Sequence, residues 1–541
     1  MRDLMQDWPL RVSSILDHAA RYHPDRRIVS RDVEGPISTT RYSTIRADAL
    51  RCAQALVKLG LRPGDVVGVM AWNTARHLKV WYGVSGAGAV LHTLNPRLFA
   101  DQLSYIVNHA EDRVLMVDPD LVPVIERVAA QLKGVAHIIV LTDRANMPQT
   151  TLANVLCYEE LVADVDGDFA WITGDERDPC GICYTSGTTG NPKGVVYTHR
   201  SNVIHALAVS VPDCLDIHAT DVVMPVVPLF HANGWSLAYS TPLNGAGLVM
   251  PGRDMSPAGI YEMLEQGVTV TAAVPTIWLG LLQYLKAEGK RFSTLSKVII
   301  GGSSCPRAVI EAFQNDYGVR VFHAWGMTET SPLGTTASFK PEVIALEPAA
   351  QLDIQTTVGH PPYTVDLKIV DDEGADLPWD NATQGRLLVR GPGVVQRYLK
   401  AETDAVDQQG WFDTGDIATM DGLGYVRITD RSKDVIKSGG EWISSIELEN
   451  AAVAHPAVAE AAAIGVPHEK WGERPILVVV PAEGQSPAKE DILALVAKSF
   501  AKWQVPDDVL FMETLPHTAT GKISKKDLRI QLKEMAYRLA G

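Results

Sequence analysis

Short runs of β-branched residues alternate with helical patterns of apolar residues along the first three-quarters of the chain. The runs predict buried strands, and the helical spacing between them predicts surface-covering helices. The predicted strands are residues 66–70, 114–117, 137–141 and 298–300, and the predicted helices are 45–59 and 101–110. Alternation of this kind favours parallel sheets with helices on both faces, so we predict an α/β fold.

The last quarter of the chain has a different pattern. Residues 411–416 and 424–426 look like turns of a β-rich region, and the charged run at 430–434 predicts a short joint between domains. Beyond the joint, the predicted elements are helices at 445–454 and 490–500 and strands at 461–466 and 476–480. We expect a large N-terminal domain over 1–430, with parallel-type sheets, flanking helices and a β-rich subdomain. A hinge at 431–433 and a small α+β domain over 434–541 would follow.

Charge and cysteine content disfavour several classes of protein. The 541 residues carry a formal net charge of −15, whereas a nucleic-acid-binding surface is basic. Six scattered cysteines do not predict a disulfide framework, and the C-x-x-C pair of Cys180 and Cys183 lacks the second pair of a zinc site. Asp3 and Asp7 stand where a signal peptide has its apolar core, and no apolar run is long enough to span a membrane. We expect a cytoplasmic protein without a nucleic-acid partner, and a homodimer is left open.

A loop rich in glycine and hydroxyl groups follows a strand-like stretch at 181–184. The segment 184–195 reads YTSGTTGNPKGV. Its glycines expose backbone N–H groups, its hydroxyls add donors, and Lys193 adds a point charge suited to phosphate. A flexible linker is the alternative, but a linker would not need the closing Pro-Lys-Gly. We interpret the loop as a polyphosphate cradle formed by Thr185, Ser186, Gly187, Thr188, Thr189, Gly190 and Lys193.

The loop differs from the common phosphate loop of nucleotide hydrolases. That pattern places a Lys directly after a Gly and before a Ser or Thr, whereas Lys193 lies between Pro192 and Gly194. Gly521 and Lys522 are followed by Ile523 and lack the upstream glycine of the pattern. A Walker-type NTPase is therefore disfavoured.

An aromatic ring, a hydroxyl and a carboxylate stand within five residues at Trp325, Thr328 and Glu329. A carboxylate repels a triphosphate unless a divalent cation lies between them, so Glu329 in a triphosphate site indicates Mg²⁺. Taken alone, Glu329 is explained equally well as an acid in the first turn of a helix.

Six motifs occur in the order and spacing of one superfamily. They are YTSGTTGNPKGV at 184–195, PLFHANGW at 228–235, AWGMTETSP at 324–332, GWFDTGD at 410–416, DRSKD at 430–434 and LPHTATGK at 515–522. Over about residues 42–529 the chain resembles the adenylate-forming enzymes, which comprise acyl-CoA synthetases, peptide-synthetase adenylation domains and beetle luciferases. The resemblance implies activation of a small carboxylic acid by ATP and Mg²⁺ with formation of AMP, and transfer of the acyl group to CoA.

The resemblance assigns roles at the nucleotide. It implies that Trp325 stacks on adenine, that Thr328 and Glu329 hold phosphate and metal, and that Asp416 binds the ribose with Arg431 as a second ligand. Taken alone, Asp416 is explained as a turn residue. The other predicted nucleotide contacts are Gly302, Ser303, His323, Ala324, Gly326 and Met327, and Thr185 is predicted to join Glu329 at the metal. Many relatives have Tyr in place of Trp325 and Gln-Gly in place of His323-Ala324.

A lysine and a hinge are implied to separate the two steps. Lys522 is implied to stabilise the charge that grows during adenylation, although taken alone it is explained as a solvated tail lysine. Lys433 is implied to be the pivot of a mobile C-terminal domain, whose movement withdraws Lys522 and presents the loop 437–441. CoA is then expected to pass beside Lys437, Gly439, Gly440 and Glu441.

The carboxylic acid is expected beside His231 and Trp235. The first matches the family's carboxylate-side histidine and the second a gate across the acyl tunnel, although each is also explained as a core aromatic. Gly302, Trp325 and Pro332 complete the predicted acid site. Bulky rings here favour a modest, apolar acid of short or medium chain length. The HANGW and SGGEWISSIE segments resemble methylmercaptopropionate-CoA ligases, and a short fatty acid such as butyrate would fit the same pocket.

Other activities share these motifs. A peptide-synthetase-like enzyme would load a carrier protein, and the lack of a carrier domain and of an acid that binds an amino group disfavours it. A luciferase-type oxygenase would share every ATP motif, and only an assay for light or O₂ consumption excludes it. A non-catalytic AMP sensor is expected to lose Lys522 or Glu329, and both are present.

Overall fold

The computed structural model describes residues 4–185, 191–439, 441–517 and 523–535. By its internal contacts the chain divides into two compact units, and each is described by itself. Unit 1 comprises Met1–Asp366 and Arg390–Phe412, and unit 2 comprises Leu367–Val389 and Asp413–Gly541. The predicted domains and hinge concern a movable joint, so the boundaries at 430, 431–433 and 434 stay predictions.

Unit 1 contains a seven-stranded sheet with the order β7-β6-β5-β3-β4-β8-β9. Its strands are parallel, except that β9 runs antiparallel to β8. They are rich in Val, Ile and Leu because helices cover both faces of the sheet. The strands are β3 (Val66–Met70), β4 (Val90–Thr93), β5 (Asp112–Val117), β6 (His137–Val140), β7 (Val155–Cys157), β8 (Pro179–Tyr184) and β9 (Gly194–Thr198).

A second sheet of unit 1 has eight strands in the order β15-β14-β13-β12-β10-β11-β1-β2. The inner strands are parallel, and the antiparallel strands β15 and β2 form the two edges. The strands are β1 (Arg27–Arg31), β2 (Ile37–Arg41), β10 (Val222–Pro225), β11 (Gly247–Met250), β12 (Val270–Ala273), β13 (Lys297–Ile300), β14 (Arg320–Gly326) and β15 (Leu333–Thr336).

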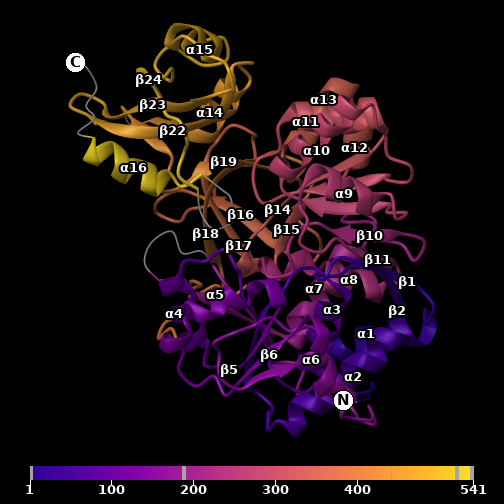
Figure 1. Cartoon of the computed structure of the whole chain (residues 1–541). Coiled ribbons are helices and arrows are strands. Elements are labelled where there is room, and N and C mark those ends of the chain that lie inside the picture. Colours follow the sequence, from indigo (N-terminus) through magenta and orange to yellow (C-terminus); the bar gives the residue numbers. More distant parts are fainter. Residues whose placement is uncertain (1–3, 186–190, 440, 518–522, 536–541) are drawn as a thin grey trace. The chain divides into compact units, whose positions relative to one another are not determined.

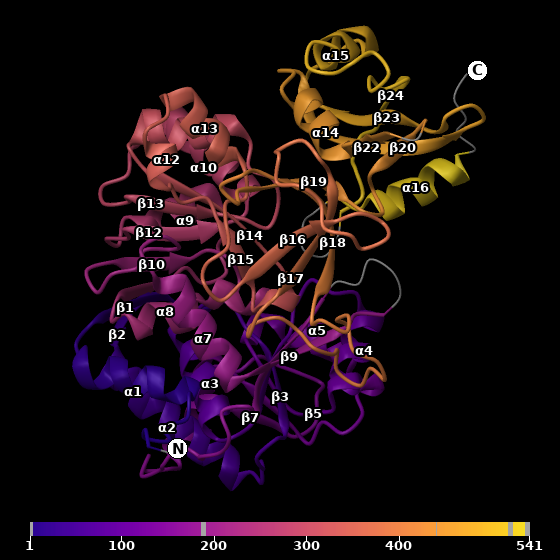
Figure 2. The same ribbon diagram turned by 180° about the vertical axis from the view of Figure 1, so that it is seen from behind.

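Helices fill the space between these two sheets and cover their outer faces (Figures 1 and 2). The middle layer is α1 (Val12–Tyr22), α2 (Tyr42–Lys58), α3 (Ala75–Gly86), α7 (His199–Ser210) and α8 (Leu237–Leu243). The outer layers are α4 (Ala100–Ala110) and α5 (Val122–Glu126) on the first sheet, and α9 (Pro257–Leu264), α10 (Pro275–Glu288) and α11 (Arg307–Glu311) on the second. Further helices are α6 (Tyr158–Ala163), α12 (Pro341–Ile344) and α13 (Pro348–Thr356).

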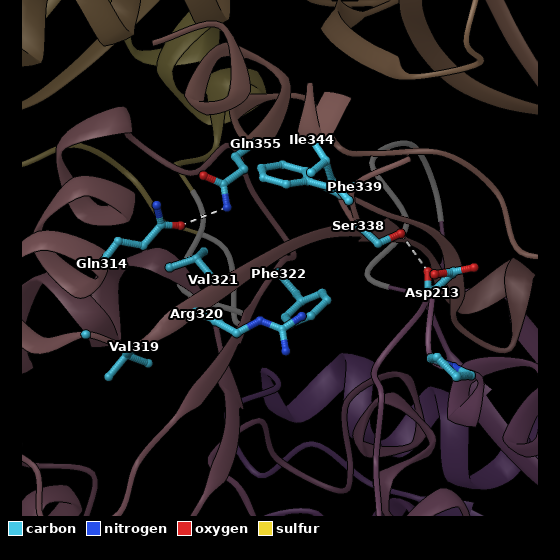
Figure 3. A pocket seen from close by; sticks show the side chains of 13 residues that line it. Asp213, Gln314, Val319, Arg320, Val321, Phe322, Ser338, Phe339, Ile344 and Gln355 are labelled. Carbon is cyan, nitrogen blue, oxygen red and sulfur yellow. Dashed lines mark hydrogen bonds between the residues drawn. The ribbon is translucent and has the colours of Figure 1, made fainter. Parts of the chain in front are cut away.

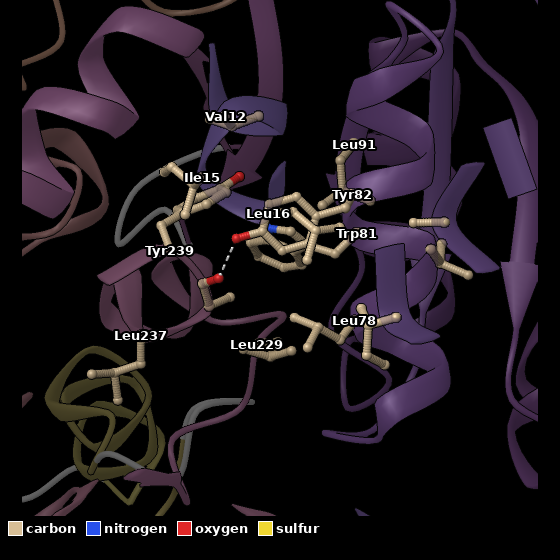
Figure 4. Packing of buried hydrophobic residues seen from close by; sticks show 14 of the residues in the cluster. Val12, Ile15, Leu16, Leu78, Trp81, Tyr82, Leu91, Leu229, Leu237 and Tyr239 are labelled. Atoms are coloured by element: carbon tan, nitrogen blue, oxygen red, sulfur yellow. Dashed lines mark hydrogen bonds between the residues drawn. The ribbon is translucent and has the colours of Figure 1, made fainter. Parts of the chain in front are cut away.

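The middle layer of unit 1 packs around large side chains of α1, α3 and α8 (Figure 4). Leu16, Trp81, Tyr82 and Tyr239 are fully buried there. The Tyr82 hydroxyl donates to the Ala238 carbonyl at 2.7 Å, so the polar end of that ring has a partner inside the core. This rigid layer supports the strand ends that carry the predicted site.

Over the residues that the structure describes, unit 2 contains two smaller sheets and three helices. One sheet has the order β16-β17-β18-β19, and the other has the order β21-β20-β23-β22 with β24 beside β23. Helices α14 and α15 pack on one face of the second sheet and α16 packs on the other. The bounds are β16 (Asp366–Val370), β17 (Gly385–Arg390), β18 (Phe412–Met420), β19 (Val426–Arg431), β20 (Ile436–Ser438), β21 (Glu441–Ile443), β22 (Val458–His468), β23 (Gly472–Pro481), β24 (Asp508–Phe511), α14 (Ser445–Val453), α15 (Lys489–Val496) and α16 (Lys525–Glu534).

The α/β fold with parallel-type sheets in its larger part is confirmed, and each predicted strand and helix outside 411–426 overlaps an element of that type. The prediction of turns at 411–416 is wrong, because residues 412–416 begin β18. Turn residues can occupy this strand because Gly415 has a φ of +71° and its N–H bonds to the Asp413 side chain at 2.9 Å. The turn at Gly424 precedes β19 as predicted.

No helix among the described residues combines the length and the apolarity that a membrane span requires.

Candidate active site

The phosphate loop connects β8 and β9, two antiparallel neighbours in the sheet of unit 1. Tyr184 pairs with Gly194 at its base, and the Thr185 N–H donates to the Lys193 carbonyl at 2.9 Å. The two ends of the loop are therefore fixed to each other. The predicted ligands at 186–190 lie outside the described residues, whereas Thr185 and Lys193 lie at the base, with Lys193 exposed.

A series of contacts between polar side chains supports this base. The Tyr184 hydroxyl lies 2.6 Å from Nδ1 of His109, and the Tyr184 ring lies 5.1 Å from that of His92. Nδ1 of His92 bonds to the Asp112 carboxyl at 2.8 Å, and both of these side chains are fully buried. Burial raises the pKa of Asp112, while the histidine opposes the shift. Tyr184 is thus held at both its ring and its hydroxyl.

Glu329 lies in a 3₁₀ turn, Thr328–Thr330, which directly follows β14 and Met327. Its residue is only 8% exposed, so burial of the carboxylate requires partners. The Tyr398 hydroxyl donates to its Oε1 at 2.8 Å, and the Val395 N–H donates to its carbonyl at 2.8 Å. The Tyr197 hydroxyl donates to the Thr328 carbonyl at 2.7 Å. The turn is therefore fixed by two segments distant in sequence.

The predicted metal ligands fit Mg²⁺. Thr185 offers a hydroxyl oxygen and Glu329 a carboxylate oxygen, and hard divalent cations prefer oxygen ligands. Glu329 is held in place by Tyr398, which also contacts the phosphate loop, since Lys193 Nζ lies 4.9 Å from the centre of the Tyr398 ring. The residues that would hold the metal and the phosphates are thus joined through one side chain.

The Trp325 ring packs on a surface made by glycine. A Cβ on Gly334 would overlap the indole, so Gly334 allows the ring to lie against backbone. A Cβ on Gly326 would overlap the Pro332 carbonyl, which accepts the Met327 N–H at 2.9 Å. Close packing of this kind makes the glycines necessary for the orientation of Trp325.

The segment that carries His231 and Trp235 has an unusual backbone. Its short helix, Ala232–Ser236, contains three non-glycine residues with positive φ: Ala232 at +41°, Trp235 at +55° and Ser236 at +65°. Such conformations persist only where neighbours enforce them, and they are concentrated at functional sites. The Trp235 ring lies against the backbone of Gly301, whose added Cβ would be 3.2 Å from Cη2.

The adenine-side residues lie at two neighbouring strands: Gly302 and Ser303 follow β13, and His323 and Ala324 lie within β14. An added Cβ on Gly301 would be 2.9 Å from the Ala324 carbonyl, so these two segments are in contact, while Ser303 is exposed. Gly302 has a φ of +82°, a conformation that favours glycine. His323 is buried, and burial lowers the pKa of its ring. His323 therefore stays neutral at pH 7.

Unit 2 carries the predicted ribose ligands. Asp416 on β18 and Arg431 on β19 are neighbours in the sheet, and Arg431 Nε lies 2.8 Å from Asp416 Oδ1. Next to them Lys433 is exposed, and partial desolvation of its ammonium group lowers its pKa. Asp416 is buried, whereas an added Cβ on Gly415, which precedes it, would have nothing within 4 Å.

The predicted CoA loop is the hairpin between β20 and β21, with Ser438 paired to Glu441. Gly439 has a φ of +64°, and its N–H donates to the Trp471 carbonyl at 2.8 Å. Lys437 lies with Nζ 5.6 Å from the centre of the Trp442 ring. Gly440 and Lys522 lie outside the described residues.

Comparison with known proteins identifies the family. The AMP-binding enzyme family matches residues 16–399, and the AMP-binding enzyme C-terminal domain matches residues 447–522. The chain belongs to the AMP-binding enzymes. It is 48% identical over 531 residues to the 3-methylmercaptopropionyl-CoA ligase of Ruegeria lacuscaerulensis, with 98% of each chain covered.

Two further proteins support this membership in the AMP-binding enzymes. The medium-chain-fatty-acid–CoA ligase of Ectopseudomonas oleovorans is 42% identical, with 96% of this chain and 95% of that protein covered. The crystal structure of ATP-bound MatB from Rhodopseudomonas palustris has a TM-score of 0.81 and 26% identity, and it covers 98% of this chain and all of that one. The match extends over both units of this AMP-binding enzyme.

Two residues of this AMP-binding enzyme that the sequence did not suggest hold the site together. Tyr398 contacts both Glu329 and Lys193. Asn73, fully buried, donates to the carbonyls of Pro225 and Val227 and accepts the Leu229 N–H, which fixes the strand end leading to His231. A buried Asn with three backbone bonds is a positioning device, but an isolated Asn after a strand gives no such signal in the sequence.

Two cavities lined by described residues of unit 1 differ in their relation to the predicted site. One of about 310 Å³ adjoins the phosphate loop and is lined by Lys193, Tyr398, His109 and Lys400, among others. The other, of about 480 Å³, lies where β14 begins, and Figure 3 shows Arg320, Phe322, Gln314 and Gln355 around it. None of the predicted site residues lines the larger cavity, so its size does not make it the active site.

Proposed function

We propose that this AMP-binding enzyme is an AMP-forming acyl-CoA ligase. In the first step a carboxylate oxygen attacks the α-phosphorus of ATP, and pyrophosphate leaves, which gives the acyl-adenylate. In the second step the CoA thiol attacks the acyl carbon, its proton is lost to solvent, and AMP leaves with the electron pair of the broken C–O bond.

The observation that carries the proposal is the contact of Tyr398 with both Glu329 and Lys193 beside the phosphate loop. It brings an oxygen ligand for a metal and a cation for phosphate to one place. Bound Mg²⁺ would supply neutralisation of the phosphate charge. Lys193 would bind phosphate oxygens, Glu329 and Thr185 would hold the metal, and Trp325 would support the adenine.

The residues of unit 2 would serve the same reaction. Asp416 and Arg431 would bind the ribose, and Lys522 would stabilise the charge that develops on the reacting oxygens during adenylation. Lys433 would act as the pivot between the two steps. The hairpin containing Lys437, Gly439, Gly440 and Glu441 would then line the approach of CoA.

For the acid we propose 3-methylmercaptopropionate or a fatty acid of similar short to medium length. The Trp235 ring, close against Gly301, limits the space for an acyl chain, and His231 would face the carboxylate. The names of the two relatives, a 3-methylmercaptopropionyl-CoA ligase and a medium-chain-fatty-acid–CoA ligase, support this range. We further propose that the enzyme works in the cytoplasm, where ATP and CoA are available, and that it forms a homodimer.

The test is a measurement of ATP- and CoA-dependent AMP release over straight-chain acids of increasing length and thioether acids. We expect the highest kcat/KM for 3-methylmercaptopropionate and butyrate. We expect no AMP release when CoA and acid are left out. Acid-dependent ATP–pyrophosphate exchange without any acyl-CoA product would overturn the CoA assignment in favour of a carrier protein. Light emission or O₂ consumption would instead favour an oxygenase.

A further inference from the structure

The hydroxyl of Tyr398 bonds to a carboxylate, unlike those of several tyrosines in the core of unit 1. The hydroxyls of Tyr42, Tyr82 and Tyr197 each donate to a backbone carbonyl, as expected of tyrosines that only complete a core. The hydroxyl of Tyr398 donates to the buried Glu329 carboxylate at 2.8 Å. A hydrogen bond to a carboxylate is stronger than one to a carbonyl. This bond therefore fixes the direction of the Glu329 carboxylate.

The ring of Tyr398 has a second partner of opposite charge. Lys193 Nζ lies 4.9 Å from the ring centre, within the range of a cation–π interaction. Tyr398 is half-buried, so this contact is partly shielded from water.

Backbone hydrogen bonds tie the segment that carries Tyr398 to both partners. The Val395 N–H donates to the Glu329 carbonyl, and the Leu399 N–H donates to the Gly194 carbonyl, each at 2.8 Å. Gly194 directly follows Lys193. The segment 395–399 thus joins the turn of Glu329 to the end of the phosphate loop, and Tyr398 lies between these two attachments.

A lysine and a glutamate in one nucleotide site attract each other when the nucleotide is absent. A direct ion pair between them would have to be broken before phosphate and metal could bind. A π face and a neutral hydroxyl are weaker partners, which phosphate and metal can replace or share. We propose that Tyr398 is a positioning residue that holds Lys193 ready for phosphate and Glu329 ready for Mg²⁺. This proposal rests on the proposed function of the same site.

Two substitutions separate the two contacts. Tyr398→Phe removes the hydroxyl and keeps the ring, so the Mg²⁺ concentration at half-maximal effect should rise about tenfold, the low end for a bond to a charged group. Tyr398→Leu also removes the ring and its contact with Lys193. In the presence of EDTA, this variant should therefore bind ATP two- to fivefold more weakly than Tyr398→Phe does. Calorimetry of ATP binding with and without Mg²⁺ measures both effects, and acid-dependent ATP–pyrophosphate exchange provides the KM and kcat values.

Tyr197→Phe is the matched control, because it removes a hydroxyl that holds the backbone of the same turn. It should lower thermal stability and leave the Mg²⁺ midpoint unchanged. A wild-type Mg²⁺ midpoint in Tyr398→Phe, or equal shifts in the two Phe variants, would overturn the proposal. If the wild-type enzyme binds Mg-ATP but shows no acid-dependent exchange, the proposed function fails, while the binding data still decide the role of Tyr398. If the Leu variant does not fold, the Phe variant carries the test alone.

Discussion

Two loops of this enzyme carry lysines that are predicted to act on the nucleotide, Lys193 for phosphate binding and Lys522 for catalysis, and the bases of these loops are built differently. The base of the phosphate loop is part of a sheet, with β8 and β9 paired from Pro179 to Tyr184 and the Tyr184 ring packed below Gly194. In the described residues that flank the loop carrying Lys522, the base consists of a bridge between His517 and Ile523 and a bond of 2.7 Å from the Ser524 N–H to the Pro516 carbonyl.

The second base depends on charged groups in the helix that follows it. Lys525 of α16 forms an ion pair with Glu449 at 2.6 Å, and both side chains are largely buried. Arg529, one turn further, pairs with Asp434 at 2.7 Å. A strand ladder spreads its free energy over many bonds, whereas a buried ion pair concentrates it in two side chains. The second loop should therefore be far more sensitive to single substitutions.

The largest effect is expected from Lys525→Met. It leaves the Glu449 carboxyl, whose pKa burial already raises, without its ion partner, and loss of one partner of a buried pair costs about 3–5 kcal/mol. Urea unfolding, followed by hydrogen exchange of α14 and β22, should show the loss in unit 2. Lys526→Met is the control, because Lys526 is exposed. Equal losses in the two variants would mean that the ion pair does not anchor α16.

The next largest effect is expected on the rate of adenylation when Lys522 of the second loop is replaced. Lys522→Ala should reduce adenylation by about 10²–10³-fold, since it removes a group that stabilises developing charge. Formation of the thioester from supplied acyl-adenylate should be spared, and Mg-ATP should still bind at the phosphate loop. Single-turnover assays of the two half-reactions measure this. An equal fall in both half-reactions would contradict a lysine that serves only the first step.

A smaller effect is expected at the base of the phosphate loop. In Gly194→Ala the new Cβ would lie 3.0 Å from Cζ of Tyr184 and 3.2 Å from Cβ of Leu399, and overpacking of this kind costs about 1–3 kcal/mol. We expect a higher KM for ATP with less change in kcat. Gly280→Ala in α10 is the control, because its Cβ would have room and alanine favours the helix. Unchanged ATP kinetics in Gly194→Ala would show that the base tolerates displacement.

The smallest effect is expected in the pH dependence of stability. It concerns His205, which contacts the start of β15, the strand that follows the turn of Glu329. His205 accepts the Leu333 N–H at Nε2, at 3.0 Å, and burial lowers its pKa to about 4. Because the unfolded chain binds the proton first, this contribution is complete above pH 6.5 and is lost as pH falls toward 4. One unit below 6.5 the loss is about 1.4 kcal/mol. The fall in Tm between pH 7.5 and 5.5 should be smaller in His205→Gln than in the wild type, and equal falls would contradict it.

Much of the fold and part of the site could be predicted from the sequence because their signals are local. Strand β3 follows from one run of β-branched residues, and the phosphate loop follows from glycines and hydroxyls closed by Lys193. The same local reasoning fails at 412–416, where Asp413 and Gly415 suggest a turn. Pairing with neighbouring strands there outweighs local preference, and Gly415 accommodates the irregularity with its positive φ.

The sequence by itself determined the α/β class and the order of the motifs, and it made Lys193, Trp325 and Glu329 candidates for the site, because residue type and spacing carry that information. Only the tertiary structure decided which side chains hold these groups. Tyr398 is 69 residues from Glu329 in the chain, and Asn73 is 156 residues from Leu229. Contacts over such separations depend on how sheets and loops pack against one another, and no local pattern of residues records that packing.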